Sequence, residues 1–391
     1  MRVSKIFSFY LITVLELVTI TGLAPIPSFS KIPQKTVLNG TIGSTVPNPA
    51  IKVGQLQDTA YTYTGADCVV NDYGVHIDDH VTIVVIDDGL TELEWKALEQ
   101  NPEATVNIIG FLTNCTNNVT KYITNPNDAF LDNQVEHGHG FEVISVLAAV
   151  ARDIKVIFVD LQYGTDPFGF EYGDYKIWEW IDNNQATYDI DIISWSCVSR
   201  RNFTNSAIEQ KWDSLLKKNV MLLTAAGNFG NAGNRLGDYY YMYQSWYTEW
   251  YAIGSIDHED RDGSWKGYKS WFSSWYECYT EGNHIVNWLE PGNGIPVLTN
   301  PYLDRDLQIA RGIWKYGRGT SYSTPYLAAI VALIITGYHR GIGSSTDPSL
   351  QKVIDMLLYA SSRSTFDQKM GYGYVDAYLA YGKAFTEGRV A

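Results

Sequence analysis

Five polar residues in this sequence stand where side chains could carry out nucleophilic chemistry. Asp87 ends the apolar run VVID, Asn228 ends the run LLTAAGN, and Ser321 stands just before a long apolar stretch. Two histidines, His137 and His139, lie in the segment EHGHGFEV. A serine attacks a carbonyl when an imidazole takes its proton, a carboxylate holds the imidazole, and an amide N–H binds the developing oxyanion. Each residue alone could be an ordinary turn or capping residue, so their joint order along the chain carries the signal.

The two histidines could instead hold a metal ion. A His-x-His pair can clamp a metal, and His139 with Glu142 has the i, i+3 spacing that zinc sites use. A metal site needs a third ligand, however, and no further cluster of His, Cys or Glu stands at ligand spacing. None of the 4 cysteines belongs to a CxxC or CxxH motif. We therefore predict no metal site and expect one histidine to be a general base.

The apolar pattern predicts the scaffold that positions these residues. From about residue 80 onward, short runs rich in Val and Ile alternate with helical patterns, which is typical of a parallel sheet with helices on both faces. In such an α/β fold, active sites lie beyond the carboxyl ends of the strands. We predict strands at 81–89, 104–112, 154–161, 189–196, 220–228 and 250–257, and helices at 141–151, 174–184, 206–219 and 323–341.

Three motifs around these residues resemble those of the subtilisin-like serine proteases, the subtilases or peptidase S8 family. GTSYSTP (319–325) resembles the nucleophile motif Gly-Thr-Ser-x-Ala-x-Pro, with Ser323 in place of the alanine. VVIDDGL resembles the motif around the catalytic aspartate, and AAGN (225–228) resembles the oxyanion motif. Weaker matches, such as DIDIISWSCVS, LEPG and GYGYVDAYLAY, extend the resemblance over roughly residues 75–385.

The resemblance implies a subtilisin-like fold and a serine endopeptidase that works through an acyl-enzyme. Ser321 would be the nucleophile and Asp87 would hold the histidine. Asn228 and the backbone N–H of Ser321 would bind the oxyanion. The substrate would pair as an added strand with Ser196, Cys197 and Val198.

The resemblance also decides between the histidines, because the family's motif is His-Gly-Thr-x-Val-Ala-Ser/Gly. Counting from His137 puts Glu142 at a small buried position, which is costly unless the charge is paired. Counting from His139 puts Val143 and Ser145 on family positions without a gap, and it leaves Glu142 at a variable, exposed position. We therefore predict His139 as the base.

Several features depart from the family pattern. Asp88 follows the catalytic aspartate where the family has Thr or Ser, which places a second carboxylate beside the site. The segment SCVS (196–199) is bulkier than the family's glycine-rich version, so no preference for the residue before the cleaved bond is predicted. Residues 113–135 and 298–318 resemble insertions flanking the cleft, either restricting access or forming neutral surface loops.

Other functions remain as alternatives with weaker support. Asp88 and Phe141 at motif positions are compatible with a catalytically impaired subtilisin-fold surface or binding protein. A peptidase relative that uses Glu and Asp in place of the histidine is disfavoured by the histidine motif and by AAGN. A lipase or esterase is disfavoured because no G-x-S-x-G motif surrounds a candidate serine.

Composition excludes nucleic acid as a partner. The 391 residues carry a formal net charge of −14 at pH 7, whereas phosphate contacts need clustered Lys and Arg. The resemblance implies polypeptide substrates and no required cofactor, and we expect a monomer. The resemblance allows calcium, but no calcium site can be assigned. The aromatic-rich segment 237–254 is interpreted as packing rather than as a sugar-binding surface.

Residues 1–30 have the pattern of a secretory signal peptide, with small residues before a cut at Lys31. Glu16 interrupts the apolar stretch and weakens both this interpretation and that of an uncleaved membrane anchor. We predict a secreted or cell-surface glycoprotein with no stable membrane span, since the apolar run 327–336 is too short to cross a bilayer. The predicted regions are a signal peptide at 1–30, an N-terminal arm or short pro-region at 31–75 and a peptidase domain at 76–391, with sequons at Asn39, Asn114, Asn118 and Asn202.

The cysteines permit disulfides in an exported protein. The predicted pair is Cys68 with Cys115. Cys197 lies in an apolar strand and is expected to be a buried thiol.

Overall fold

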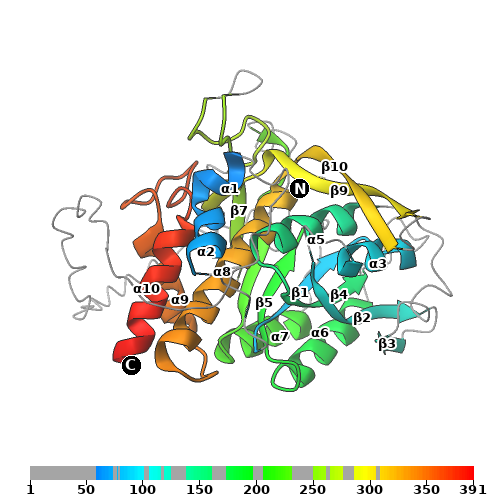
Figure 1. Ribbon diagram of the computed structural model, residues 1–391. Coiled ribbons are helices and arrows are strands. Elements are labelled where there is room, and N and C mark those ends of the chain that lie inside the picture. The colour runs from blue at the N-terminus through cyan, green and yellow to red at the C-terminus, as the bar shows by residue number, and fades with distance from the viewer. Residues whose placement is uncertain are drawn as a thin grey trace, which may run out of the picture. The chain divides into compact units, whose positions relative to one another are not determined.

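An eight-stranded sheet lies at the centre of the computed structural model, and it confirms the predicted α/β fold (Figure 1). The strands are β1 (Thr82–Asp87), β2 (Asn107–Cys115), β3 (Val119–Ile123), β4 (Lys155–Asp160), β5 (Ile190–Trp195), β6 (Met221–Ala225), β7 (Tyr251–Ile256) and β8 (Val286–Pro291). Their order in the sheet is β3-β2-β4-β1-β5-β6-β7-β8. All neighbours are parallel except β2 and β3, which are antiparallel.

The structure describes part of the chain, all of it within the unit Lys52–Ala391. The described residues are 59–73, 77, 80–100, 105–115, 119–124, 138–160, 173–196, 206–230, 250–260, 265–275, 286–304 and 309–391. The predicted signal peptide, most of the predicted arm, three of the four sequons and Cys197 lie outside these residues. The predicted boundaries at residues 30 and 75 stay predictions.

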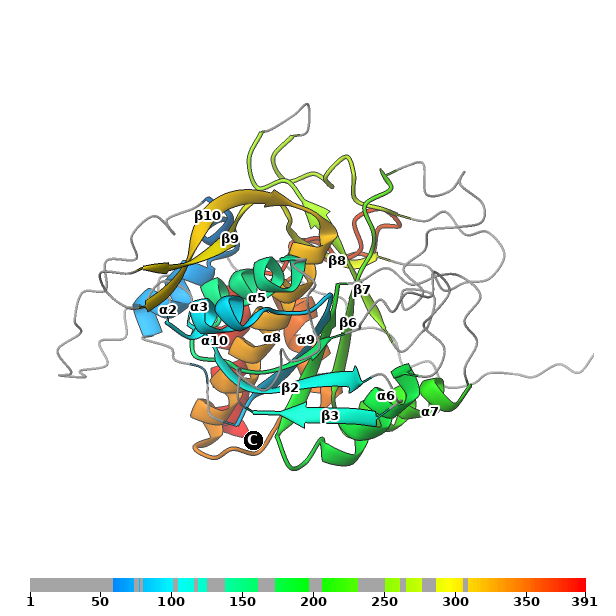
Figure 2. The same ribbon diagram turned by 90° about the vertical axis from the view of Figure 1, so that its right-hand side faces the viewer.

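Helices cover both faces of the sheet, which explains why its strands are continuous apolar runs (Figure 2). Successive residues of β1 point to opposite faces. Ile83 and Val85 pack in a cluster with residues of α5 (His139–Val150) and α8 (Thr320–Ile342). Val84 and Ile86 pack in a second cluster with residues of α6 (Gly173–Asn184) and α7 (Ser206–Lys217). Each of the six predicted strands and four predicted helices has its counterpart in this framework.

The helix α8 is the core of the first face. Its residues from Thr320 to His339 are buried, and it packs against α5 and against α10 (Ala377–Val390). Among the described residues it is the one helix long and apolar enough to cross a membrane, yet its apolar window is 100% buried inside the protein. α8 is therefore a core helix, and α9 (Leu350–Ala360) packs beside it.

Two short helices, α1 (Thr59–Thr64) and α2 (Ala66–Tyr73), precede the sheet and pack into the same core. The hydroxyl of Tyr326 on α8 donates to the carbonyl of Ala60 (3.1 Å) and is hydrogen-bonded to Thr64 Oγ1 (2.6 Å). The ring of Tyr61 stacks on that of Tyr326, with centroids 5.7 Å apart. These residues, assigned from the sequence to an N-terminal arm or pro-region, thus contact the helix that carries Ser321.

Both predicted insertions contain regular structure. β9 (Asn293–Asp304) and β10 (Ile309–Arg318) form an antiparallel hairpin where 298–318 was interpreted as an insertion. The hairpin packs on α5 and on α3 (Glu92–Gln100), and β10 leads directly into α8. In the other insertion, β3 pairs with β2 at the edge of the sheet.

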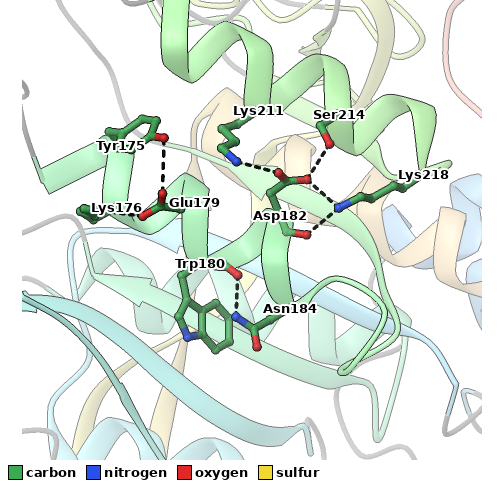
Figure 3. Close-up of polar contacts among 9 residues, drawn as sticks. All are labelled: Tyr175, Lys176, Glu179, Trp180, Asp182, Asn184, Lys211, Ser214 and Lys218. Carbon is green, nitrogen blue, oxygen red and sulfur yellow. Dashed lines mark hydrogen bonds and ion pairs between the residues drawn. The ribbon is translucent and has the colours of Figure 1, made fainter.

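On the second face, Asp182 joins α6 to α7 (Figure 3). Its carboxylate accepts hydrogen bonds from Lys211 Nζ (2.9 Å), Ser214 Oγ (2.7 Å) and Lys218 Nζ (2.7 Å). Burial alone would raise the pKa of Asp182, but these donors outweigh it and hold the pKa below its ordinary value. A buried carboxylate with three donors fixes the two helices against each other.

The aromatic-rich segment 237–254 is described only from residue 250 onward. Trp250 is buried and packs edge-on against Trp178 (5.9 Å between centroids) and Trp212 (5.4 Å). This part of the segment agrees with the packing interpretation.

The predicted disulfide between Cys68 and Cys115 is wrong. Cys68 is a free, exposed thiol on α2. The reason lies in the topology, because α2 packs against α10 whereas Cys115 ends β2, next to the edge strand β3.

Candidate active site

Asp87 and His139 are brought together by the end of β1 and the start of α5. Asp87 is the last residue of β1 and is fully buried, and His139 is the first residue of α5. Asp87 Oδ1 lies 2.6 Å from His139 Nδ1. Gly140 permits this close approach, because a Cβ at that position would lie 2.6 Å from the carbonyl oxygen of Gly89. The residue pair predicted as carboxylate and base therefore forms a direct hydrogen bond.

The acids around His139 set the protonation of its imidazole. Burial alone would lower the pKa of His139, but the charge and hydrogen bond of Asp87, helped by Asp88 and Glu142, raise it to about 9. In the neutral ring a proton on Nδ1 faces Asp87, which leaves Nε2 as an acceptor. Because a general base must be neutral, any reaction that uses His139 will accelerate as the pH rises toward this value.

Asp88 contacts both sides of this junction. Its N–H donates to Asp87 Oδ1 (2.9 Å), and its own Oδ1 accepts the N–H of Gly140 (2.9 Å). Burial and the neighbouring Asp87 carboxylate raise the pKa of Asp88 to about 7. The second carboxylate that the sequence places beside the site is thus hydrogen-bonded into it.

Ser321 is the second residue of α8 and is buried. Its Oγ donates to the carbonyl of Ser196 at 3.4 Å, and Ser196 Oγ donates to the carbonyl of Ser321 at 2.9 Å. These two bonds join the start of α8 to the end of β5. The ring of Tyr322, the next residue, has its centroid 5.9 Å from that of the His139 ring, so the first turn of α8 lies near His139.

Asn228 follows β6 and is held in one orientation by Thr320. Asn228 Oδ1 accepts hydrogen bonds from the N–H (2.8 Å) and the Oγ1 (3.0 Å) of Thr320. A Cβ on Gly319 would lie 3.4 Å from Asn228 Nδ2 and 3.8 Å from Ser321 Oγ, so the amide nitrogen and the hydroxyl border the same small space. With Oδ1 engaged, Nδ2 is the end of the amide that can donate to a bound group.

The predicted exposed position of Glu142 is wrong. Its side chain is 14% exposed and pairs with Lys315 Nζ at 2.8 Å. The hydroxyl of Tyr322 donates to its other carboxylate oxygen. Glu142 therefore links α5 to β10 and α8. The helical register assigned it to a face but could not foresee partners that are more than 170 residues away in the chain.

Asp87, Asp88 and His139 offer ligand atoms within 4.8 Å of one another, an arrangement that a cation could use. Asp87 Oδ1 and His139 Nδ1 are hydrogen-bonded to each other, and Asp88 Oδ1 accepts the N–H of Gly140. The other carboxylate oxygen of Asp87, Oδ2, is buried and makes no hydrogen bond within the described part of the chain. The expectation of no metal site stays a prediction.

The remaining predicted residues fall outside the described part of the chain. His137 does so, and so do Cys197 and Val198 of the predicted substrate-binding segment.

The residues that the sequence analysis missed are Thr320, Lys315 and Tyr322. Thr320 stands in the GTS motif and could have been suspected from it, whereas Lys315 and Tyr322 left no signal in the sequence.

Comparison with known proteins shows the family and the fold of this chain. A sequence model of the subtilase family matches residues 78–373, which is more than half of the chain, and no curated protein matches. Among solved structures, a lanthipeptide protease has 20% identity and a TM-score of 0.60, covering 85% of this chain and 98% of its own. The prenylagaramide maturation protease PagA has 17% identity and a TM-score of 0.54, covering 81% of this chain and 98% of its own. These structures share the fold, and the chain belongs to the subtilase family of serine peptidases.

Proposed function

We propose that this subtilase is a secreted serine endopeptidase that hydrolyses peptide bonds through an acyl-enzyme on Ser321. The observation that carries the proposal is the 2.6 Å hydrogen bond between buried Asp87 and His139, in the same neighbourhood as the start of α8. A carboxylate bonded to Nδ1 fixes the imidazole tautomer that can take a proton at Nε2 and stabilises the imidazolium that results. These are the requirements of a base that activates a serine.

In the proposed acylation, Ser321 Oγ turns from the carbonyl of Ser196 to His139 Nε2, which takes its proton. Oγ forms a bond to the substrate carbonyl carbon, and the carbonyl oxygen becomes an oxyanion. Asn228 Nδ2 and the N–H of Ser321, in the first turn of α8 where no earlier helical acceptor exists, bind that oxyanion. His139 then protonates the leaving amine as the C–N bond breaks.

In the proposed deacylation, a water molecule gives a proton to His139 and attacks the acyl carbon. The bond to Ser321 Oγ breaks, Oγ recovers the proton, and the acid product leaves. Apart from the substrate and one water molecule, the groups in these steps come from the chain itself, so the proposal routes no step through a cofactor. The polypeptide is expected to pair as a strand with residues 196–198, and the predicted signal peptide is expected to direct export.

Labelling with a fluorophosphonate, which reacts with activated serines, tests the nucleophile. We expect the wild type to be labelled at a rate that rises with pH toward about 9, because the pKa of His139 is raised to that value. Ser321→Ala should abolish labelling. Ser323→Ala is the matched control, since Ser323 Oγ is buried and donates to the carbonyl of Glu290; this variant should be labelled like the wild type. Labelling that persists in Ser321→Ala would refute the assignment.

The base and the export are tested separately. His139→Ala should lose casein hydrolysis and His137→Ala should keep it; the reverse result would move the base to His137. The N-terminal sequence of material collected outside the producing cell should begin at or after Lys31. Protein that stays inside the cell with an intact N-terminus would contradict export without touching the assignment of Ser321.

A further inference from the structure

The helix that carries His139 has no side-chain cap of its own. Its N-cap residue, Gly138, lies in the left-handed region (φ 72°) and makes no side-chain capping hydrogen bond. The first N–H groups of a helix need acceptors from elsewhere, and a carboxylate there also gains from the helix dipole. Asp88 Oδ1 accepts the N–H of Gly140 at 2.9 Å. A residue from the end of β1 therefore caps α5.

Two adjacent residues at the end of β1 each make a hydrogen bond to one of two adjacent residues at the start of α5. Asp87 bonds to His139, and Asp88 bonds to Gly140. The two hydrogen bonds are connected, because the N–H of Asp88 donates to Asp87 Oδ1, the oxygen that is also hydrogen-bonded to the imidazole. Rotation of α5 about its axis would break both bonds together. Asp88 therefore restrains the angle at which His139 meets Asp87.

The helix that carries Ser321 is built in a parallel way. Its N-cap residue, Gly319, makes no side-chain capping bond, and the N–H of Thr320 donates to Asn228, which follows β6. Both helices that present predicted catalytic residues thus begin after a glycine and are capped by a side chain from a strand end. At both helices, the residue that caps the helix also fixes where the predicted catalytic residue lies relative to the sheet.

We propose that Asp88 is a positioning residue that fastens the start of α5 to the end of β1 and so holds His139 against Asp87. The role rests on the proposed function of His139 as the base, although its geometry can be measured without any reaction. Asp88 has a second effect through its charge, because its ionised carboxylate favours the protonated imidazole. The other charged groups around the junction are Asp87 on β1, His139 and Glu142 on α5, Glu94 on α3, Asp160 on β4 and Lys315 on β10.

Two substitutions separate the effect of the hydrogen-bond acceptor of Asp88 from the effect of its negative charge. Asp88→Asn keeps an oxygen that can accept the N–H of Gly140 and removes the charge, whereas Asp88→Ala removes both. Asp213→Asn is the matched control, because Asp213 is an exposed carboxylate on α7, which covers the second face of the sheet. If Asp88→Ala does not fold, Asp88→Leu takes its place, since its side chain is of similar size and has no hydrogen-bond acceptor.

Kinetics against pH give the first readout. In Asp88→Asn the acidic limb of kcat/KM should move to lower pH by about one unit, and the plateau should stay within about threefold of the wild type. The sign follows because removing a negative charge lowers the pKa of His139, so the neutral base persists at lower pH. Asp88→Ala should lower kcat at the plateau roughly 10- to 100-fold with little change in KM.

Histidine NMR in the Ser321→Ala background gives a second readout that needs no activity. The His139 titration should move to lower pH in Asp88→Asn while the low-field Nδ1 proton signal is kept, and that signal should be lost in Asp88→Ala. The proposal is overturned if Asp88→Ala keeps the low-field signal and the plateau kcat of Asp213→Asn, or if the two Asp88 variants behave alike in both readouts. A wild type that cleaves nothing yet shows these NMR shifts would refute the proposed function and leave the positioning role standing.

Discussion

Truncation of Asn228 to alanine tests how the site stabilises a transition state. The side chain is exposed and its Oδ1 is engaged by Thr320 at 2.8 and 3.0 Å, which leaves Nδ2 as the donor beside Ser321. Removal of one oxyanion donor costs about 3–4 kcal/mol of transition-state stabilisation, so kcat should fall roughly 100- to 1,000-fold. KM should stay nearly constant, because the donor meets full charge only in the transition state.

Thr320→Val tests how much of this loss in kcat depends on the orientation of the Asn228 side chain. It removes the 3.0 Å bond from Thr320 Oγ1 to Asn228 and the 3.1 Å bond that Oγ1 accepts from the N–H of Gly227, and it keeps the 2.8 Å bond from the backbone N–H to Asn228. Loss of the bond that orients Asn228 is worth about 1 kcal/mol, so kcat should fall about fivefold. If Thr320 acts only by orienting Asn228, the double variant should have the kcat of Asn228→Ala alone.

The assay is the steady-state hydrolysis of a fluorogenic peptide. The values of kcat and KM are determined separately for the wild type, the two single variants and the double variant. Thermal unfolding of each variant confirms that the fold is retained. A rise in KM with unchanged kcat in Asn228→Ala would show that Asn228 binds the ground state, and additive effects in the double variant would show that Thr320 acts by another route. Either outcome would refute the reasoning above.

Two further predictions concern stability. Asp182→Asn should lower the free energy of unfolding in urea by about 2 kcal/mol at pH 7, because it breaks a carboxylate cluster with three donors. The pKa of Asp182 is lowered in the fold, so its contribution is present above the ordinary value of 3.8 and is lost as the pH falls below it; a deficit that persists in acid would contradict the assignment. Glu290 is fully buried, and its burial raises its pKa well above the ordinary value of 4.5. The wild type should therefore lose stability as the pH rises above 4.5, and Glu290→Gln should gain in Tm relative to it from pH 4 to pH 8; a constant difference would contradict a neutral buried acid.

The framework of the site could be predicted from the sequence because it follows from local pattern. The strand that ends at Asp87 is buried on both faces, so it appears as an uninterrupted apolar run with one carboxylate at its end. His139 could be preferred over His137 because only the register that begins at His139 puts Val143 and Ser145 on positions of the family's motif without a gap. The resemblance to a family then joined these separate positions into one site.

The rest could not be predicted because it depends on contacts between distant segments. Glu142 looks like a surface residue until Lys315 and Tyr322 are known to meet it. The capping role of Asp88 is invisible for the same reason, since the sequence gives a departure from a motif but not the N–H that it contacts. The residues of α1 have too few apolar positions to show periodicity, although Ala60 and Tyr61 are buried.

The place of α8 in the chain has a consequence for the synthesis of this protein. Asp87 and His139 leave the ribosome early, whereas Ser321 follows late, on a helix whose surface is covered in part by α10. Until residues 377–390 have emerged, α8 lacks part of its apolar cover. Because α8 is the core of one face of the sheet, that face is completed only when the last helix has been made. The start of α8 therefore takes its place beside His139 late in the synthesis of the chain.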